Sequence, residues 1–160
     1  MRISFDLDDV LFVSPDRYET EPVPNVLFGR LFRERLRKGT KELIHTLQER
    51  GYEVWIYTSS YRTEKYLCAL FRGYGIRFDG VVNALRHNKE VQRSRNERLP
   101  QKLPNFYRIS LHIDDEKAVQ DNALRYGYRT MQIYEPDEHW VEKVLDEADR
   151  VYTLVQAEHS

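Results

Sequence analysis

The stretch that decides the fold is Met1-Arg-Ile-Ser-Phe-Asp6-Leu-Asp8-Asp9-Val10, where the printed sequence starts. Residues 2–5 have the composition of a short β-strand. Three carboxylates, Asp6, Asp8 and Asp9, follow that strand within four positions. Carboxylates held this close repel one another, so they either raise a pKa or attract a cation. We therefore expect a charged site where the first strand ends.

Strand and helix patterns alternate along the rest of the chain. The predicted strands are residues 51–57, 81–82, 109–113 and 129–133, and the predicted helices are residues 40–50, 63–71, 116–126 and a last one from about 137. Thr40 and Asp137 are the expected N-caps of the first and last helices, and Gly51 and Gly127 are expected to end two of them. This alternation predicts an α/β fold, a Rossmann-like three-layer sandwich with a central parallel sheet.

Length and composition suit one domain. The chain has 160 residues, of which 41% are hydrophobic and 32% charged, so a single domain over residues 1–160 can bury a core. Two segments, at about 14–38 and 86–102, do not follow the alternation and are expected to be short irregular insertions. The formal net charge of −1 gives no general attraction to nucleic acid or anionic lipid, so such a partner would need a local patch.

Cysteine usage and hydropathy bear on the compartment. Cys68 is the single cysteine, which excludes an internal disulfide and a cysteine-based zinc site. No stretch approaches the ~20 apolar residues of a membrane span, and acidic residues stand where a signal peptide would have its apolar centre. We expect a cytoplasmic protein with no membrane partner.

Polar residues also follow two of the other predicted strands. Thr58 and Ser59 come directly after the second strand, and Asp114 and Asp115 come after the fourth. Parallel sheets bind ligands beyond the carboxyl ends of their strands, so we expect these side chains to converge with Asp6. Hard carboxylate oxygens favour Mg2+, which leaves coordination positions for water and a phosphate oxygen. Phosphoryl transfer is the chemistry that this pattern predicts.

Three motifs resemble those of the haloacid dehalogenase superfamily of phosphatases. Asp6-Leu-Asp8-Asp-Val10 is similar to the first motif, D-x-D-x-[TV]. Val54-Trp-Ile-Tyr-Thr58 resembles the second motif, an apolar strand ending in Thr or Ser, and Leu111-His-Ile-Asp-Asp115 resembles the acidic fourth motif. The resemblance covers nearly the whole chain in the right order. It implies a Mg2+-dependent phosphohydrolase that acts on a phosphate ester through an aspartyl-phosphate intermediate.

The resemblance assigns a role to each acidic residue. Asp6 would be the nucleophile and a Mg2+ ligand. Asp8 would be the general acid and base, and its backbone carbonyl a second metal ligand. Asp115 aligns best as the metal ligand from the fourth strand, with Asp114 beside it binding a metal-bound water or orienting the site.

The phosphate is expected to meet hydroxyls and a lysine. The resemblance places the phosphate at Thr58, with Ser59 next to it. It also calls for a lysine that neutralises the phosphate, and the chain offers Lys102 and Lys89 ahead of the fourth strand. Lys102 is preferred for its spacing from that strand, and Lys89 is the alternative.

The sequence departs from the superfamily pattern at two places. Asp9 stands where the superfamily often has glycine, and the fourth motif reads Asp-Asp-Glu instead of Gly-Asp with another acid four residues later, where this chain has Val119. Both usual insertion points are short, which implies a minimal or absent cap. The phosphorylated substrate is then a small molecule or a macromolecule, and a second subunit of a homo-oligomer is an alternative lid.

A second function is open at this point, a catalytically idle binding or regulatory protein. Its partner would contact the basic segment 86–98 or the helical-looking residues 27–36. The basic segment could also contact nucleic acid. We do not favour that partner, because Glu90 and Glu97 interrupt the charge and stacking aromatics are missing.

Overall fold

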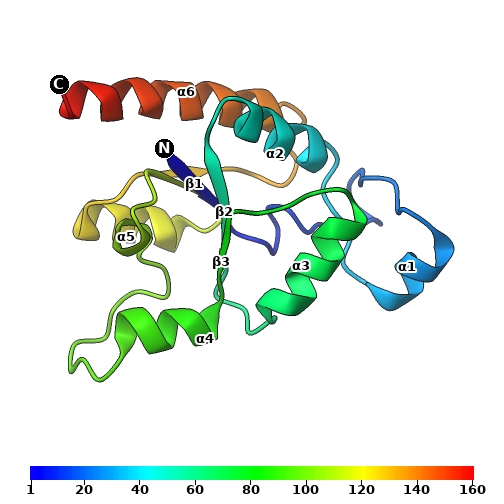
Figure 1. Cartoon of the computed structure of the whole chain (residues 1–160), viewed down its shortest axis with the longest axis horizontal. Coiled ribbons are helices and arrows are strands. Elements are labelled where there is room, and N and C mark those ends of the chain that lie inside the picture. The colour runs from blue at the N-terminus through cyan, green and yellow to red at the C-terminus, as the bar shows by residue number, and fades with distance from the viewer.

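A computed structural model describes residues 1–160 of the chain, and its centre is a five-stranded sheet in which every pairing is parallel (Figure 1). The strands lie in the order β3-β2-β1-β4-β5. Their bounds are β1 (Arg2–Phe5), β2 (Glu53–Tyr57), β3 (Gly80–Val82), β4 (Leu111–Asp114) and β5 (Thr130–Gln132). The predicted α/β class with a central parallel sheet is confirmed.

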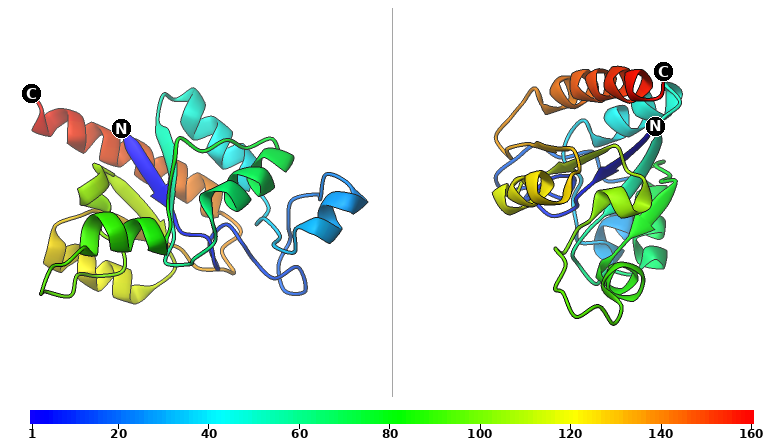
Figure 2. Two further views of the ribbon diagram at one scale, coloured as in Figure 1. Left: turned by 60° about the horizontal axis from the view of Figure 1, so that its bottom comes forward. Right: turned by 90° about the vertical axis from the view of Figure 1, so that its left-hand side faces the viewer.

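Helices connect the strands and cover the sheet (Figure 2). They are α1 (Val26–Leu31), α2 (Thr40–Glu49), α3 (Glu64–Gly73), α4 (Ala84–His87), α5 (Lys117–Tyr126) and α6 (Trp140–Glu158), with a π-helical turn η1 (Asn88–Gln92) and a 3-10 turn η2 (Pro104–Tyr107). None of these helices combines the length and the apolar character needed to cross a bilayer.

The two faces of the sheet are covered by different helices. Figure 1 shows α3 and α5 on opposite sides of the strands, and α6 lying beside α2. The largest apolar cluster joins the strands to α2, α3 and α6, and it includes the fully buried Leu43 and Leu47 of α2 and Val144 of α6. Val119 and Ala123 of α5 belong to a separate small cluster. Burial of these apolar faces is the main source of stability, because it removes hydrocarbon surface from water.

The position of β1 decides where the site lies. β1 is the middle strand, and its Ile3 is in register with Val54 of β2 on one side and Leu111 of β4 on the other. The chain leaves β1 toward β2 and later returns to β4 on the opposite side, so the strand order reverses at β1. A crevice opens at such a switch point, beyond the carboxyl ends of the strands. Asp6 follows β1 directly into that crevice.

Segment 14–38 contains a shorter helix than its sequence suggests. Only Val26–Leu31 is helical, and the chain then runs back so that Leu36 pairs with Phe12 in an isolated antiparallel bridge. The apolar residues of 27–36 therefore do not all face the core. Phe28 packs edge-on against Tyr74 with ring centroids 5.2 Å apart, whereas Leu27 and Leu31 are exposed. Figures 1 and 2 show α1 at the edge of the molecule, away from the sheet.

Other element boundaries also differ from the predicted ones. The first part of segment 86–102 is helical, because α4 continues into η1 before the irregular chain begins at residue 93. Gly39, in the left-handed region, precedes α2, while the Thr40 hydroxyl donates to the Arg37 carbonyl from inside the helix. Asp137 lies before the first turn of α6 and accepts from the His139 N–H. Gly51 does take up the left-handed conformation expected after α2, with φ of 82°.

Candidate active site

The carboxyl ends of β1 and β4 bring three carboxylates together. Asp6, Asp114 and Asp115 each offer an oxygen atom, and these atoms all lie within 4.8 Å of one another. Asp6 and Asp114 are buried and Asp115 is half-buried. Parallel pairing of neighbouring strands produces this arrangement, because the Asp6 N–H continues the ladder by donating to the Ile113 carbonyl at 2.9 Å.

A buried lysine bridges two of these carboxylates. Lys102 Nζ lies 3.0 Å from Asp6 Oδ1 and 2.5 Å from Asp114 Oδ2, and its side chain is only 4% exposed. Burial by itself would lower the pKa of Lys102, but the two carboxylates outweigh it and raise that pKa above its ordinary value. The next residue fixes the loop, since the Leu103 N–H donates to the Tyr57 hydroxyl at 2.9 Å. Lys102 is therefore a charged ammonium held against the acids.

A hydrogen-bonded chain orients Asp114. His112 Nε2 lies 2.8 Å from Asp114 Oδ2, and His112 Nδ1 lies 2.7 Å from Ser4 Oγ. Burial lowers the pKa of His112, so the ring is neutral, donates from Nε2 and accepts the Ser4 hydroxyl at Nδ1. Burial also acts to raise the pKa of Asp114, but the bond from His112 and the charge of Lys102 outweigh it and lower that pKa. Asp114 is thus a fixed anion whose oxygen is already shared by His112 and Lys102.

Ionisation of the other two acids is opposed in the folded protein. Burial raises the pKa of Asp6 to about 7 in spite of Lys102, and burial with the nearby Asp114 raises the pKa of Asp115 to about 6. A cation beside them would relieve both effects, and an all-oxygen donor set suits Mg2+. The residues present therefore fit a Mg2+ site at Asp6 and Asp115, with Asp114 beside it.

Asp8 forms a different set of contacts. Its two carboxylate oxygens accept from the two Nη atoms of Arg62, each at 2.9 Å, and Arg62 Nε donates to Glu34 Oε1 at 3.1 Å. Glu34 also accepts from the Tyr66 hydroxyl. The Asp8 side chain is 55% exposed, in contrast to the buried Asp6. Segment 14–38 is thereby linked through Glu34 and Arg62 to Asp8.

The remaining predicted residues have distinct surroundings. Thr58 is buried after β2, and its Oγ1 accepts from the Ser60 N–H at 3.1 Å. Ser59 is exposed, and so is Lys89, which lies on η1 and has no acidic partner. Asp9 has a left-handed backbone with φ of 61°, a conformation that glycine adopts at no cost and Asp tolerates better than most residues. That geometry explains why glycine suits this position.

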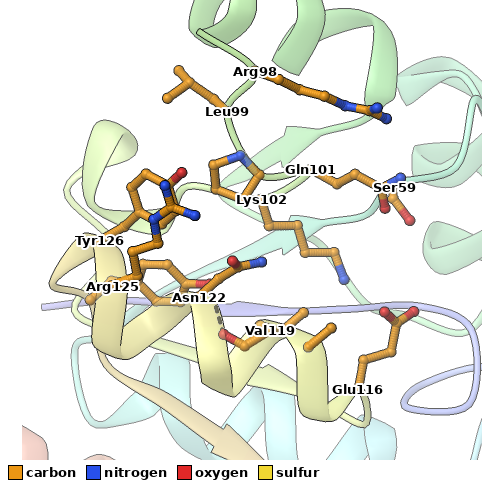
Figure 3. A pocket seen from close by; sticks show the side chains of 13 residues that line it. Ser59, Arg98, Leu99, Gln101, Lys102, Glu116, Val119, Asn122, Arg125 and Tyr126 are labelled. Atoms are coloured by element: carbon orange, nitrogen blue, oxygen red, sulfur yellow. Dashed lines mark hydrogen bonds between the residues drawn. The ribbon is translucent and has the colours of Figure 1, made fainter.

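A pocket of about 320 Å3 adjoins the cluster, and Figure 3 shows the side chains that line it. Ser59 and Lys102 form part of its wall, so it adjoins two residues of the predicted phosphate site, whereas none of the three clustered carboxylates lines it. Figure 3 shows the Lys102 amine and Glu116 at one end and Arg125 with Tyr126 at the other.

Several contacts of the site were not predicted from the sequence. The roles of Arg62 and Ser4 depend on residues 54 and 108 positions away, respectively, so no local pattern reveals them. His112 offered a weak signal, because alternate residues of a strand share a face and His112 precedes Asp114 by two positions.

Sheet order and strand-end residues together resemble the haloacid dehalogenase-like α/β fold: the middle strand ends in Asp-x-Asp, and its two neighbours end in Thr and Asp-Asp. Among solved structures, the chain is similar to an uncharacterized protein from Listeria monocytogenes serotype 4b, with a TM-score of 0.52 and 18% identity over 83% of this chain and 78% of that one. The chain is also similar to a predicted HAD-like family hydrolase from Porphyromonas gingivalis, with a TM-score of 0.44 and 14% identity over 90% of this chain and 97% of that one.

A third similar structure is the D,D-heptose 1,7-bisphosphate phosphatase from B. bronchiseptica, complexed with magnesium and phosphate, with a TM-score of 0.49 and 15% identity over 91% of this chain and 98% of that one. The likeness to the Listeria protein, at 18% identity, is one of fold. No protein-family model matches the chain, and no curated protein matches its sequence.

Proposed function

We propose that the chain is a Mg2+-dependent phosphohydrolase that cleaves a phosphate ester through an aspartyl phosphate on Asp6. The observation that carries the proposal is the position of the Lys102 ammonium, buried between Asp6 and Asp114 with Asp115 beside them. The Lys102 ammonium offsets part of the charge of these carboxylates and so lowers their repulsion of a phosphate dianion. A carboxylate cluster without such a cation would repel that dianion.

In the first step, one carboxylate oxygen of Asp6 attacks phosphorus. The new oxygen–phosphorus bond forms as the bond to the ester oxygen breaks, and Asp8 gives its proton to that leaving oxygen. Lys102 stabilises the negative charge on the phosphoryl oxygens, and Thr58 with Ser59 is the nearby source of hydroxyl donors. The product is an alcohol and a phosphorylated Asp6.

In the second step, water attacks the phosphoryl group and Asp8 accepts its proton. The bond between phosphorus and the Asp6 oxygen breaks, which releases inorganic phosphate and restores the carboxylate. Mg2+ held by Asp6, Asp115 and the Asp8 carbonyl would supply positive charge that reduces the repulsion between the nucleophile and the phosphate. Asp114, already bonded to His112 and Lys102, is left to orient the site.

The first test is phosphate release by the wild-type protein, with p-nitrophenyl phosphate and a panel of natural phosphate monoesters as substrates. We expect release with Mg2+ and at least about a hundredfold less after EDTA, because the excess charge at Asp6 and Asp115 is then uncompensated. Restoring Mg2+ should restore activity. Release that is indifferent to EDTA would contradict the assignment of the metal, and no release from any ester would contradict the proposed function.

Arg62 is proposed as a positioning residue for Asp8. Its two-point contact fixes the orientation of the Asp8 carboxylate, and the pair has to loosen when Asp8 exchanges a proton with the leaving oxygen or the water. We expect Arg62→Met to lower kcat roughly tenfold, a fraction of what general acid-base catalysis contributes. The melting temperature should change little, since partly exposed pairs contribute at most about 1 kcal/mol.

A purely structural role for Arg62 would leave the pH profile of kcat unchanged, so that profile is the deciding measurement. Arg62→Lys should restore only part of kcat, because an ammonium cannot make the two-point contact. Arg72→Met, at an exposed arginine on α3, is the control for loss of a surface charge. An unaltered kcat and pH profile in Arg62→Met would exclude the positioning role.

A further inference from the structure

The pocket beside the cluster contains two arginines that the chain leaves without acidic partners. Arg98 and Arg125 both line it, both are exposed, and neither forms an ion pair, as is true of nine other arginines of the chain. Arg125 instead lies with its guanidinium carbon 5.3 Å from the centre of the Tyr126 ring. Figure 3 shows the two side chains on different sides of the pocket, with Arg125 of α5 beside Tyr126 and the Arg98 guanidinium directed toward the Ser59 side. An unpaired guanidinium at the Arg125 end favours an anionic occupant there.

The charge of the pocket is positive apart from the catalytic cluster. Lys102 is already neutralised by Asp6 and Asp114, so it adds no free charge. Glu116 is the one acidic residue of the wall, and in Figure 3 it lies at the Lys102 end, away from Arg125. The end of the pocket that is remote from the proposed phosphate site is therefore the more cationic one.

Size and polarity restrict the occupant further. A volume of about 320 Å3 is at the small end of the range for small-molecule pockets, which is roughly 300 to 1,000 Å3. Besides the charged groups, Ser59, Gln101 and Asn122 contribute a hydroxyl and two amides to the wall. Such a wall suits a compact, hydroxylated molecule, and it is too small to enclose several nucleotides.

We propose that this pocket binds the leaving group of a compact phosphate monoester that carries a second anionic group, a phosphate or a carboxylate. Arg125 contacts that second group, and Arg98 adds positive charge at the opposite side of the pocket. The proposal rests on the proposed function and deepens it, because it selects small acidic phosphate esters as the substrate class. It also gives segment 86–102 a role, since Arg98 and Lys102 both belong to it.

Binding to the Asp6→Asn protein tests the pocket separately from catalysis. Calorimetry with Mg2+ present would compare fructose 1,6-bisphosphate with fructose 6-phosphate, and 3-phosphoglycerate with glycerol 3-phosphate. We expect at least one compound with the second anion to bind about tenfold to a hundredfold more tightly than its counterpart, as a charge-assisted contact allows. The pair that shows the difference identifies the anion as phosphate or carboxylate.

Adding Arg125→Met should abolish the preference while leaving the affinity of the compound without the second anion unchanged. Arg95→Met is the matched control, because Arg95 is an exposed arginine of the same segment that does not line the pocket. Equal affinities within both pairs, or a preference that survives Arg125→Met with Arg98→Met, would overturn the inference.

Turnover by the wild-type protein separates this inference from the proposed function. Arg125→Met should lower kcat/KM for the doubly anionic ester far more than for p-nitrophenyl phosphate, whose leaving group has no second anion, and the control Arg95→Met should change neither. Turnover without any preference for a second anion would overturn the inference and leave the phosphohydrolase intact. Preferential binding without turnover of any ester would support the pocket and overturn the proposed function.

Discussion

Replacing Asp6 by Asn is expected to reduce phosphate release by roughly ten thousandfold to a millionfold, the loss typical of removing a nucleophile. Asn has the same shape but lacks the charged oxygen that attacks phosphorus. The substitution also removes the Asp6 carboxylate, whose ionisation is opposed by burial, which raises the pKa of Asp6 to about 7. Such a group destabilises the folded state as pH rises through that value, so at pH 8 the variant should be at least as stable as wild type.

The measurement is steady-state phosphate release, accompanied by the melting temperature at pH 8. Asp9→Asn is the matched control, because it makes the same chemical change three positions along the chain at an exposed residue, and Asn tolerates the left-handed backbone there. That control should keep nearly full activity. Full turnover by Asp6→Asn would contradict the proposed mechanism. A wild-type protein that releases no phosphate would instead favour the binding or regulatory role.

The arrangement of the site follows from features that a sequence displays well. Helices alternating with strands predict a parallel sheet, and a parallel sheet has all its strand ends at one edge. Asp6, Asp114 and Asp115 come together for this reason, although more than 100 positions separate the first from the others. A pattern that identifies strand ends therefore identifies the members of such a cluster without any knowledge of their contacts.

The contacts themselves depend on packing that no local pattern encodes. Arg62 lies in a loop, and its sequence context is that of an ordinary surface arginine. In the structure it nevertheless forms ion pairs with both Asp8 and Glu34. Segment 27–36 has apolar residues at helical spacing, but pairing of Leu36 with Phe12 ends the helix early. In both cases a tertiary interaction outweighs the local preference, which is weak in comparison.

Lys102→Met is expected to cost about 3 to 5 kcal/mol of stability at neutral pH, because it leaves the buried Asp6 and Asp114 without their cation. Met replaces the side chain with one of similar length, so the loss reflects charge and not a cavity. Phosphate release should also fall, by about a hundredfold to a thousandfold, as expected for losing one stabilising donor. Denaturant unfolding and steady-state kinetics measure the two effects separately.

The pH dependence of the stability loss distinguishes electrostatics from packing. In wild type the raised pKa of Lys102 means that its contribution is fully present below the ordinary lysine pKa and is lost only as pH rises above it. In the variant the two carboxylates have no partner cation, so their folded-state pKa values rise, and stability is lost as pH rises through those values. The difference from wild type should therefore be small near pH 5 and large near pH 8, whereas a packing defect would cost the same at both.

Lys89→Met is the matched control for Lys102→Met, because Lys89 is the other lysine that the sequence offers for the phosphate. It is exposed on η1 and has no acidic partner, so its loss should change stability by less than about 0.5 kcal/mol. If Lys89→Met abolished phosphate release while Lys102→Met retained it, Lys89 would be the neutralising residue. The buried pair at Lys102 would then serve the fold alone. Because a buried ion pair adds little stability over an apolar core, a lysine kept there with two carboxylates is better explained by the phosphate dianion that it can receive.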